Sequence, residues 1–308
     1  MLQNAQKKSL KMQNSDDFVP NEFAPAKINL ALHIVGQTLD GYHKLESLVV
    51  FARIGDNLQI SPAKKNSFKI SGEFASSLNN SKDNLVLKAI SAYKKHFPNK
   101  IPSNLKIHLE KNLPIASGIG GGSADCAATL RLLNKLNNKE FSAQKLEEIA
   151  LSLGADVPMC LSSKPAIIKN IGEIIEPIKN FPNAYIILIN PNIKISTQQI
   201  FNDLKNKNNA PLPPTNNGFK NIKTLSTWLK NTRNDLLPPI IKTTPIISEV
   251  IDEFNKNKNC LHSNMSGSGA TVFALYESLN DAKNAATNIS KKYPHFWVKH
   301  APLMSNIY

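Results

Sequence analysis

Cysteine is scarce in this chain of 308 residues, which has only three: Cys126, Cys160 and Cys260. They are odd in number and far apart, and no two of them have the spacing of zinc ligands. We therefore expect neither a disulfide framework nor a structural metal. We expect each cysteine to be a small core residue in a reducing compartment, and we predict a cytoplasmic protein.

Long hydrophobic runs are also missing. No apolar stretch reaches the ~18 residues that a bilayer-spanning helix needs, so we expect no membrane partner. Residues 1–23 contain neither an apolar core nor an arginine, which argues against a secretory signal and against a transit peptide. We predict a polar, disordered tail over residues 1–23.

Arginine is rare, although the net charge is +14. Only three of the 37 basic residues are arginines, and the lysines are scattered among many asparagines. A patch that reads nucleic-acid phosphates would be expected to contain arginine, because the guanidinium group bonds phosphate in a bidentate manner. We therefore predict no nucleic-acid partner and expect the charge to attract small anions such as ATP. A basic RNA-binding protein remains the alternative from a different class.

Glycine is concentrated in one place. Four of the 13 glycines fall within Leu113-Pro114-Ile115-Ala116-Ser117-Gly118-Ile119-Gly120-Gly121-Gly122-Ser123-Ala124-Asp125. An alternating apolar run precedes this stretch and an Ala- and Leu-rich run over residues 124–137 follows it, which predicts strand, loop and helix. Because glycine has no Cβ, the backbone N–H groups of such a loop can approach an anion at the helix N-terminus. The pattern predicts a phosphate cradle; a flexible surface loop with tight turns is the alternative.

Two familiar phosphate-binding patterns do not fit this loop. A Walker A loop requires a lysine after its last glycine, whereas Ser123 and Ala124 follow Gly122. A dinucleotide-binding loop requires an early βαβ unit, and the preceding segment is not of that type.

Residues 26–35 alternate between apolar and mostly polar side chains and predict a strand. Ile28, Leu30, Leu32 and Ile34 share one face, and Lys27, Asn29, Ala31 and His33 share the other. Lys27 and Asn29 therefore project together, either into a site or onto a solvated face.

Polar residues at two turns could carry chemistry. Tyr42 and His43 follow an Asp40-Gly41 turn, where they could stack on and hydrogen-bond a planar base or be ordinary turn residues. Asp156 stands just past a helix that is predicted to be capped by Ser142 and to end at Gly154. A carboxylate at a helix C-terminus opposes the macrodipole, which suggests a chemical role; a simple turn is the alternative.

The second half of the chain mixes strands and helices. A buried strand is predicted over residues 185–189 and another strand over 271–276, which follows a second small-residue loop over 263–270. Helices are predicted over residues 224–232, 246–255 and 281–292. The Asn-, Lys- and Pro-rich segment up to residue 223 predicts a long mobile loop. The order of these elements suits a ferredoxin-like domain.

Three ordered motifs resemble the signatures of the GHMP kinases, the family of galactose, homoserine, mevalonate and phosphomevalonate kinases. They are P-A-K-I-N-L (25–30), P-I-A-S-G-I-G-G-G-S-A (114–124) and M-S-G-S-G-A-T-V-F (265–273). Two more, D-G-Y-H (40–43) and L-G-A-D-V-P (153–158), are similar to the branch that acts on a cytidine-bearing alcohol in non-mevalonate isoprenoid biosynthesis. The resemblance runs from about Phe23 to the C-terminus.

The resemblance implies an α+β fold of two domains with the active site between them. Residues 24–178 would form the ATP-binding domain, which is ribosomal protein S5 domain 2-like, and residues 179–308 a ferredoxin-like substrate domain. It further implies an ATP-dependent kinase that phosphorylates a tertiary 2-hydroxyl of a cytidine 5'-diphosphate alcohol, with ATP and Mg²⁺ as cofactors. No carboxylate pair can be assigned to the metal. We expect a small-molecule substrate and a monomer or weak homodimer.

The motif matches also imply residue roles. Asp156 would accept the hydroxyl proton with Lys27 as its partner, and the substrate would be bound by Asn29, Tyr42, His43, Phe201, Gly267, Ser268 and Gly269. ATP would be held by Lys111, Pro114, Ile115, Ala116, Ser117, Gly118, Ile119, Gly120, Gly121, Gly122 and Ser123. The nearest alternative is a GHMP kinase for mevalonate or homoserine, but Tyr42 and His43 favour a cytidine-bearing acceptor.

Overall fold

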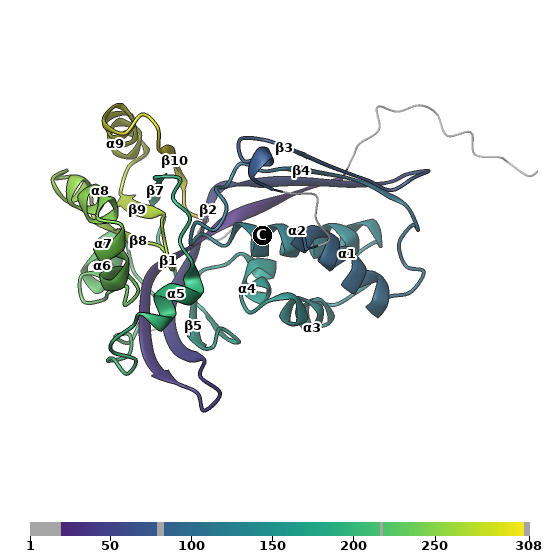
Figure 1. The fold of residues 1–308 in the computed structure, drawn as a ribbon, viewed down its shortest axis with the longest axis horizontal. Helices are drawn as coiled ribbons and strands as arrows, with labels where there is room; N and C mark the ends of the chain where they lie inside the picture. Colours follow the sequence, from purple (N-terminus) through teal and green to yellow (C-terminus); the bar gives the residue numbers. More distant parts are fainter. Residues whose placement is uncertain (1–19, 79–82, 216–217, 305–308) are drawn as a thin grey trace, which may run out of the picture.

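The computed structural model describes residues 20–78, 83–215 and 218–304, which form two β-sheets with helices packed against each (Figure 1). The predicted boundary between residues 178 and 179 falls in the connection that leads from the first sheet to the second.

The first sheet has the strand order β3-β4-β2-β5-β6, and β1 pairs with β2. All neighbours are antiparallel except β3 and β4. The strands are β1 (Asn21–Gln37), β2 (His43–Pro62), β3 (Ser67–Ser71), β4 (Leu105–Glu110), β5 (Ala166–Asn170) and β6 (Ile174–Pro177). The predicted strand over 26–35 is therefore confirmed within a longer one.

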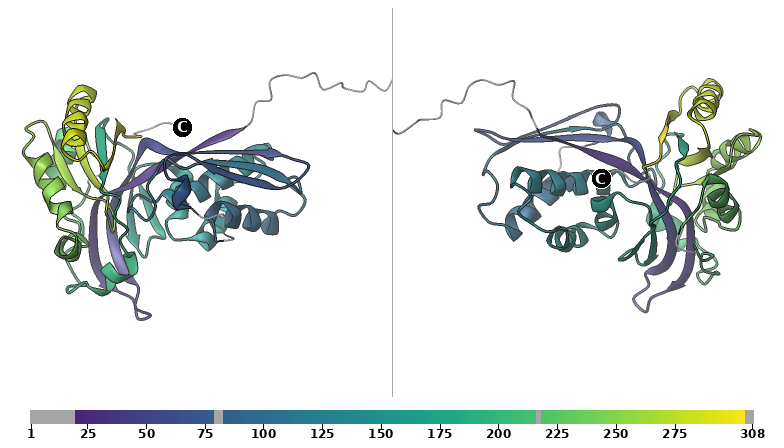
Figure 2. Two further views of the ribbon diagram at one scale, coloured as in Figure 1. Left: turned by 45° about the horizontal axis from the view of Figure 1, so that its top comes forward. Right: turned by 180° about the vertical axis from the view of Figure 1, so that it is seen from behind.

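Helices cover one face of this sheet (Figure 2). They are α1 (Leu85–His96), α2 (Gly121–Leu136), α3 (Ala143–Leu153) and α4 (Val157–Ser162), with a 3₁₀ turn at Ala75–Ser77. Ser142 caps α3 and Gly154 ends it, as the sequence predicts. Their apolar faces close over the sheet in one core that includes Phe51, Tyr93 and Leu130.

The second sheet has the order β10-β7-β9-β8, with every neighbouring pair antiparallel. This is the strand order 4-1-3-2 of a ferredoxin-like domain, which confirms that prediction. The strands are β7 (Tyr185–Asn190), β8 (His262–Met265), β9 (Val272–Tyr276) and β10 (Trp297–Pro302). The helices are α5 (Thr197–Asn202), α6 (Ile222–Leu229), α7 (Leu237–Thr243), α8 (Ile246–Asn255) and α9 (Leu279–Lys292).

The sequence reading missed α5, α7, β8 and β10. Helix α7 opens with Pro238 and Pro239 in its first turn, where the missing N–H groups cost nothing. A seven-residue helix that starts with two prolines shows too little periodicity to be recognised.

The long strands β1 and β2 run through both halves of the molecule and bend on the way (Figure 2). Their pairing shifts register between Pro25 and Ala26 and again between Asn29 and Ala31, and such bulges let a strand bend. A second core joins the sheets, because Ile28 and Val50 belong to the same buried cluster as Phe273.

The predicted disordered tail extends too far. Residues 1–19 lie outside the described residues, but Asn21, Glu22 and Phe23 already pair with β2. The buried Glu22 accepts hydrogen bonds from Arg131 and Lys135 of α2. The prediction of a disordered tail is therefore wrong for residues 21–23. Pairing with β2 and the two ion pairs of Glu22 hold this polar segment in place.

The polar segment after α5 is irregular, as predicted, but it is tied to the first sheet. Asn209 N donates to Ile34 O (3.0 Å) and Leu212 N donates to the Glu46 carboxylate (2.8 Å). Composition alone predicts a mobile loop here, because it does not reveal these distant acceptors.

Candidate active site

A cavity of about 510 Å³ lies where the helical face of the first sheet meets the second half of the chain. Segments far apart in sequence line it: β1, the glycine-rich loop, α5 and the second small-residue loop. Of the predicted site residues, the cavity is lined by Lys27, Asn29, Lys111, Pro114, Ile115, Ala116, Ser117, Gly118, Gly120, Gly121, Gly122, Ser123, Asp156, Phe201, Gly267 and Ser268.

The glycine-rich loop leads from β4 into the N-terminus of α2, as predicted. Gly120 has φ 63° and is the N-cap of α2, a left-handed conformation that glycine adopts without strain. The free N–H groups of the first turn of α2 therefore open at the cavity, and such a helix start favours an anion.

The second loop packs directly on the first. Gly118 has φ 75°, and a Cβ there would lie 2.8 Å from Gly269 N and closer still to Ser266 O. The Ser266 hydroxyl donates to Gly118 O (2.9 Å) and accepts from Asn29 N (3.1 Å). The two loops thus meet backbone to backbone, which only a glycine at position 118 permits.

Lys27 and Asp156 meet beside the first loop. Lys27 Nζ donates to Asp156 Oδ2 at 3.0 Å, and the two side chains are 8% and 46% exposed. Lys27 N donates to Ile119 O (2.9 Å), and the Lys27 side chain runs past Gly120, where an added Cβ would lie 3.1 Å from it. A largely buried ammonium and an accessible carboxylate therefore face the cavity together.

Asp156 lies just past α3, as predicted, and it also begins a second helix. α3 ends at Leu153 with Gly154 as its C-cap, and Asp156 is the N-cap of α4. Because the N-terminal pole of α4 favours a carboxylate, the argument from an unfavourable helix end does not hold by itself. The Asp156 side chain makes no capping bond, which leaves the carboxylate to Lys27.

Lys111 lies at the base of the cavity, where two acids hold it. Its Nζ lies 2.5 Å from Asp56 Oδ2 and 2.6 Å from Asp125 Oδ2, and all three side chains are buried. Burial disfavours the ammonium, but the two carboxylates outweigh burial and raise the pKa of Lys111. Burial, with Asp56 nearby, raises the pKa of Asp125. The Lys111 ammonium is therefore already paired with two carboxylates of the protein.

The opposite side of the cavity presents the amide of Asn29 and the ring of Phe201, behind which His43 packs. Asn29 Nδ2 donates to Ser47 Oγ (2.7 Å), whereas the buried Asn29 Oδ1 has no partner within the described residues. The rings of His43 and Phe201 lie 5.0 Å apart at 35°. Burial and, to a lesser extent, the nearby Lys207 ammonium lower the pKa of His43, so this imidazole is neutral at pH 7.

Some predicted residues lie apart from the cavity wall. Tyr42 is 63% exposed, Ile119 is fully buried, and neither lines the cavity; nor do His43 and Gly269. The ring of His43 packs against the ring of Phe201, and it is Phe201 that lines the cavity. The tip of the β1–β2 connection thus holds Tyr42 outside the cavity.

The sequence reading also missed residues that belong to the site. Asp56 and Asp125 complete the buried ion-pair cluster, and Thr197 lines the cavity beside Ser268, with their hydroxyl oxygens 2.7 Å apart. Asp125 ends the glycine-rich stretch, and this position was the available signal for it. Asp56 stands among Gly55, Asn57 and Gln59, where no local signal marks it.

Within the described ranges, no group of three or more histidine, cysteine, aspartate or glutamate side chains could hold a metal ion. In the same residues, no helix is long and apolar enough to cross a membrane.

Family models match both halves of the chain. The model for the GHMP kinases N terminal domain matches residues 84–164, and that for the GHMP kinases C terminal domain matches residues 217–295. The fold and the two loops over one cavity thus define a small-molecule kinase of this class.

Close relatives narrow the class. A Chelativorans protein named 4-diphosphocytidyl-2-C-methyl-D-erythritol kinase is 44% identical over 90% of this chain and 93% of its own length. An Agrobacterium fabrum protein of the same name is 46% identical over 91% and 94%. The chain belongs to the GHMP kinases and, within them, to the family of 4-diphosphocytidyl-2-C-methyl-D-erythritol kinases.

Solved structures agree with this family. A crystal structure of 4-(cytidine 5'-diphospho)-2C-methyl-D-erythritol kinase superposes with a TM-score of 0.76 at 26% identity, covering 93% of this chain and 100% of the other. The Methanococcus jannaschii mevalonate kinase superposes with a TM-score of 0.71 at 14% identity, covering 95% and 100%. The second likeness shows the shared fold alone. The predicted two-domain GHMP kinase fold is confirmed.

Proposed function

We propose that this protein transfers the γ-phosphoryl group of ATP to the 2-hydroxyl of 4-(cytidine 5'-diphospho)-2-C-methyl-D-erythritol, a step of the non-mevalonate route to isoprenoid precursors. The observation that carries this proposal is the Lys27–Asp156 pair, 3.0 Å apart beside a helix N-terminus that can hold phosphates. The printed names of its relatives support the choice of substrate.

Phosphoryl transfer requires positioning and charge stabilisation more than covalent chemistry. The carboxylate of Asp156 accepts the proton of the acceptor hydroxyl as its oxygen attacks the γ-phosphorus, and the bond to the leaving ADP breaks. The ammonium of Lys27 holds this carboxylate in place and lies where negative charge develops.

ATP would lie over residues 114–123, with its phosphates at the N–H groups of the loop and the start of α2. Gly118 and Gly120 have left-handed φ angles of 75° and 63°, which glycine adopts without strain and which shape the loop around such a cradle. Mg²⁺ would be held mainly by ATP and water, with few protein ligands, and would neutralise negative charge on the phosphates. We propose that Lys111 supports the cradle from below, because its ammonium is already bound by Asp56 and Asp125.

The acceptor would occupy the side of the cavity that faces Asn29, Phe201 and Gly267. The unpartnered Asn29 Oδ1 suits a hydroxyl donor on the acceptor, since a buried acceptor atom without a partner is costly. The neutral His43 and the ring of Phe201 suit a cytosine, which offers a π-face and an edge for hydrogen bonds. Tyr42 would have to close over the base, and Gly267–Gly269 would lie near the acceptor phosphates.

Asp156→Asn tests the base directly. We expect kcat to fall by ~10²–10⁴, the usual contribution of a general base, while the denaturation midpoint stays within the wild-type range. Asp252→Asn, which changes an exposed acid of α8 in the same way, is the control and should retain wild-type turnover. Near-normal kcat in Asp156→Asn would remove this residue as the base.

The substrate is tested by comparing acceptors. We expect the cytidylyl alcohol to be phosphorylated with a far higher kcat/KM than mevalonate or homoserine, because neither of those carries a base for the His43–Phe201 side. Preference for mevalonate or homoserine would overturn the assignment. Steeply salt-dependent RNA binding without kinase activity would favour the other class of protein.

A further inference from the structure

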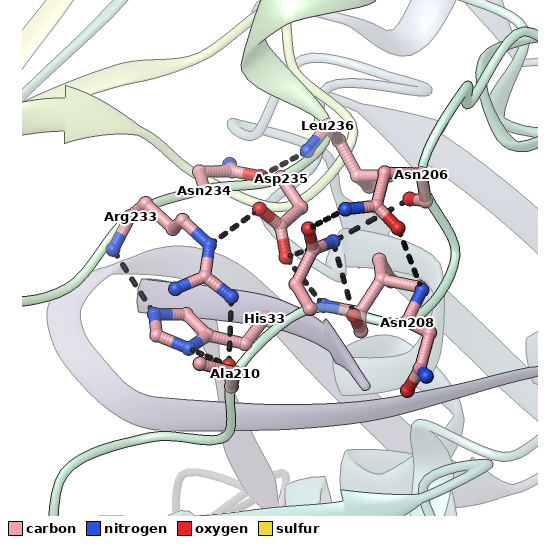
Figure 3. A network of polar contacts seen from close by, with 10 residues as sticks. His33, Asn206, Asn208, Ala210, Arg233, Asn234, Asp235 and Leu236 are labelled. Atoms are coloured by element: carbon pink, nitrogen blue, oxygen red, sulfur yellow. Dashed lines mark hydrogen bonds and ion pairs between the residues drawn. The ribbon is translucent and has the colours of Figure 1, made fainter. Parts of the chain in front are cut away.

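A tripeptide between α6 and α7, Arg233-Asn234-Asp235, takes part in a network of polar contacts with other segments of the chain (Figure 3). It runs alongside β1: Leu32 N donates to Arg233 O and Asp235 N donates to Leu32 O, each at 2.9 Å. All three of its side chains then reach other segments. None of the sequence motifs described above includes it.

Asn234 holds the second small-residue loop. It is only 4% exposed, and its Nδ2 donates to Met265 O (2.8 Å) and to Gly267 O (2.9 Å). Its Oδ1 accepts from Leu236 N (3.0 Å), so the whole amide is bonded. Because these two carbonyls are held by hydrogen bonds, the peptide planes of the loop keep one orientation. Gly267 and Ser268 therefore face the cavity in a set direction.

Asp235 and Arg233 hold the polar segment after α5. Asp235 Oδ2 accepts from Ile34 N (2.7 Å) and from Asn209 Nδ2 (3.1 Å), and Asp235 Oδ1 accepts from Arg233 Nε (2.6 Å). Arg233 Nη2 donates to Ala210 O (2.7 Å). Residues 206–210 are thereby clamped between the tripeptide and β1, as Figure 3 shows.

His33 completes the clamp. Its Nε2 accepts from Arg233 N (3.1 Å), so the ring proton lies on Nδ1, which donates to Ala210 O (3.0 Å). Burial lowers the pKa of His33, which keeps the ring in the neutral form that this arrangement needs.

The clamped segment continues directly from the aromatic side of the cavity. Phe201 lies at the end of α5, and Leu204, just after it, is buried in the same cluster as Leu236. Lys207 lies close enough to His43 to lower the pKa of that imidazole. A shift of residues 206–210 would therefore move the surroundings of both rings.

We propose that Arg233, Asn234 and Asp235 are positioning residues for the acceptor half of the cavity. Asn234 sets the loop that faces the acceptor phosphates, and Arg233 and Asp235 set the segment that follows Phe201. Within the described residues, their side chains make no hydrogen bond to residues 111–123, the ATP side. This inference rests on the proposed function.

The first test is Asn234→Asp, which replaces both N–H donors by an oxygen without changing the size of the side chain. With two hydrogen bonds lost, the KM for the cytidylyl alcohol should rise about tenfold or more, while the dissociation constant for ATP stays within about twofold. Asn231→Asp is the matched control, because Asn231 is exposed and its amide bonds only Thr227 O. It should leave both quantities unchanged.

The second test keeps the proposal decisive if Asn234→Asp does not fold. Asn209→Ala removes the side-chain bonds to Asp235 and to Ile34 O, whereas Asn208→Ala removes a neighbouring side chain that takes no part in the network. Only Asn209→Ala should raise the acceptor KM, by about threefold to tenfold.

The outcomes separate the two proposals. An unchanged acceptor KM in the folded variants, or equal weakening of ATP and acceptor binding, would overturn the positioning role. A wild-type protein that does not phosphorylate the cytidylyl alcohol at all would instead overturn the proposed function.

Discussion

At the scale of single residues, the site depends on side chains that are absent or uncharged. Gly118 lets the two loops touch through their backbones, because no Cβ separates it from Ser266 O. The neutral His33 is buried, and the neutral His262, which lies outside the cavity, is half-buried; a charge would be costly at both positions. Each of these features belongs to a single residue and can be tested by substituting that residue.

Gly118→Ala should weaken ATP binding and lower stability. The left-handed φ of 75° costs an L-residue ~1–2 kcal/mol, and the new Cβ would also press on the second loop. Urea unfolding and calorimetric titration with ATP measure the two effects. Gly36→Ala is the control, since a Cβ there would meet nothing closer than 3.7 Å. Equal behaviour of the two variants would show that close loop contact is unimportant.

Stability should fall in mild acid because of buried histidines. Burial, and less so Lys230, lowers the pKa of His262 to about 4. The unfolded chain then binds the proton more readily than the folded chain. The stabilisation that the neutral His262 contributes is therefore complete above pH ~6.5 and is lost as the pH falls toward 4, a loss of ~3 kcal/mol in all. His262→Leu should flatten the dependence of the unfolding free energy on pH, whereas His300→Leu, at an exposed position, should not. An unchanged slope in His262→Leu would contradict the assignment.

At the scale of elements, one ion-pair cluster ties β2, β4 and α2 together beneath the glycine-rich loop. Asp56 belongs to β2, Lys111 directly follows β4, and Asp125 lies in the first turns of α2. Asp56 also accepts from Asn112 N and Leu113 N. The start of α2 is therefore held at the sheet by charge as well as by packing.

Lys111→Met should leave two buried carboxylates without a counter-ion. Breaking a buried ion pair in this way costs ~3–5 kcal/mol, which chemical denaturation would detect. Adding Asp125→Asn to Lys111→Met should recover part of this loss, because one buried charge is removed. Lys106→Met on the exposed face of β4 should have little effect. If Lys111→Met matched that control, the cluster would contribute nothing to the fold.

At the scale of the whole molecule, the two sheets share a core and a pair of strands. β1 and β2 pass through both halves, and the cluster that contains Ile28 and Val50 also contains Leu188 and Phe273. Single isolated bridges, Leu32 with Asn234 and Ala52 with Leu303, add to this connection. The cavity lies at this junction, so its geometry depends on both halves being folded.

Unfolding should therefore be a single transition. Trp228 and Trp297 both belong to the second half, whereas far-ultraviolet circular dichroism reports helices of both. We expect the two signals to give the same midpoint in urea. Phe273→Ala should lower the unfolding free energy by ~3–5 kcal/mol and should lower both midpoints together. Two separate midpoints would show that the halves unfold independently.

The sequence by itself determined what depends on near neighbours. Alternation predicted β1 and β4, Ser142 and Gly154 predicted the ends of α3, and the glycines with the loop motifs predicted the phosphate cradle and the family. These signals are local, because hydrogen-bonding period, capping and the lack of a Cβ act within a few residues. The motifs also predicted which residues to examine at the site.

Only the tertiary structure decided which distant groups meet. It brought Lys27 to Asp156 across 129 positions, bound Lys111 to Asp56 and Asp125, and placed Asn234 under the second loop. It also moved Asp156 to the start of α4 and fixed a polar segment that composition reads as mobile. Such contacts depend on burial and on partners supplied by chain folding, so no local pattern encodes them.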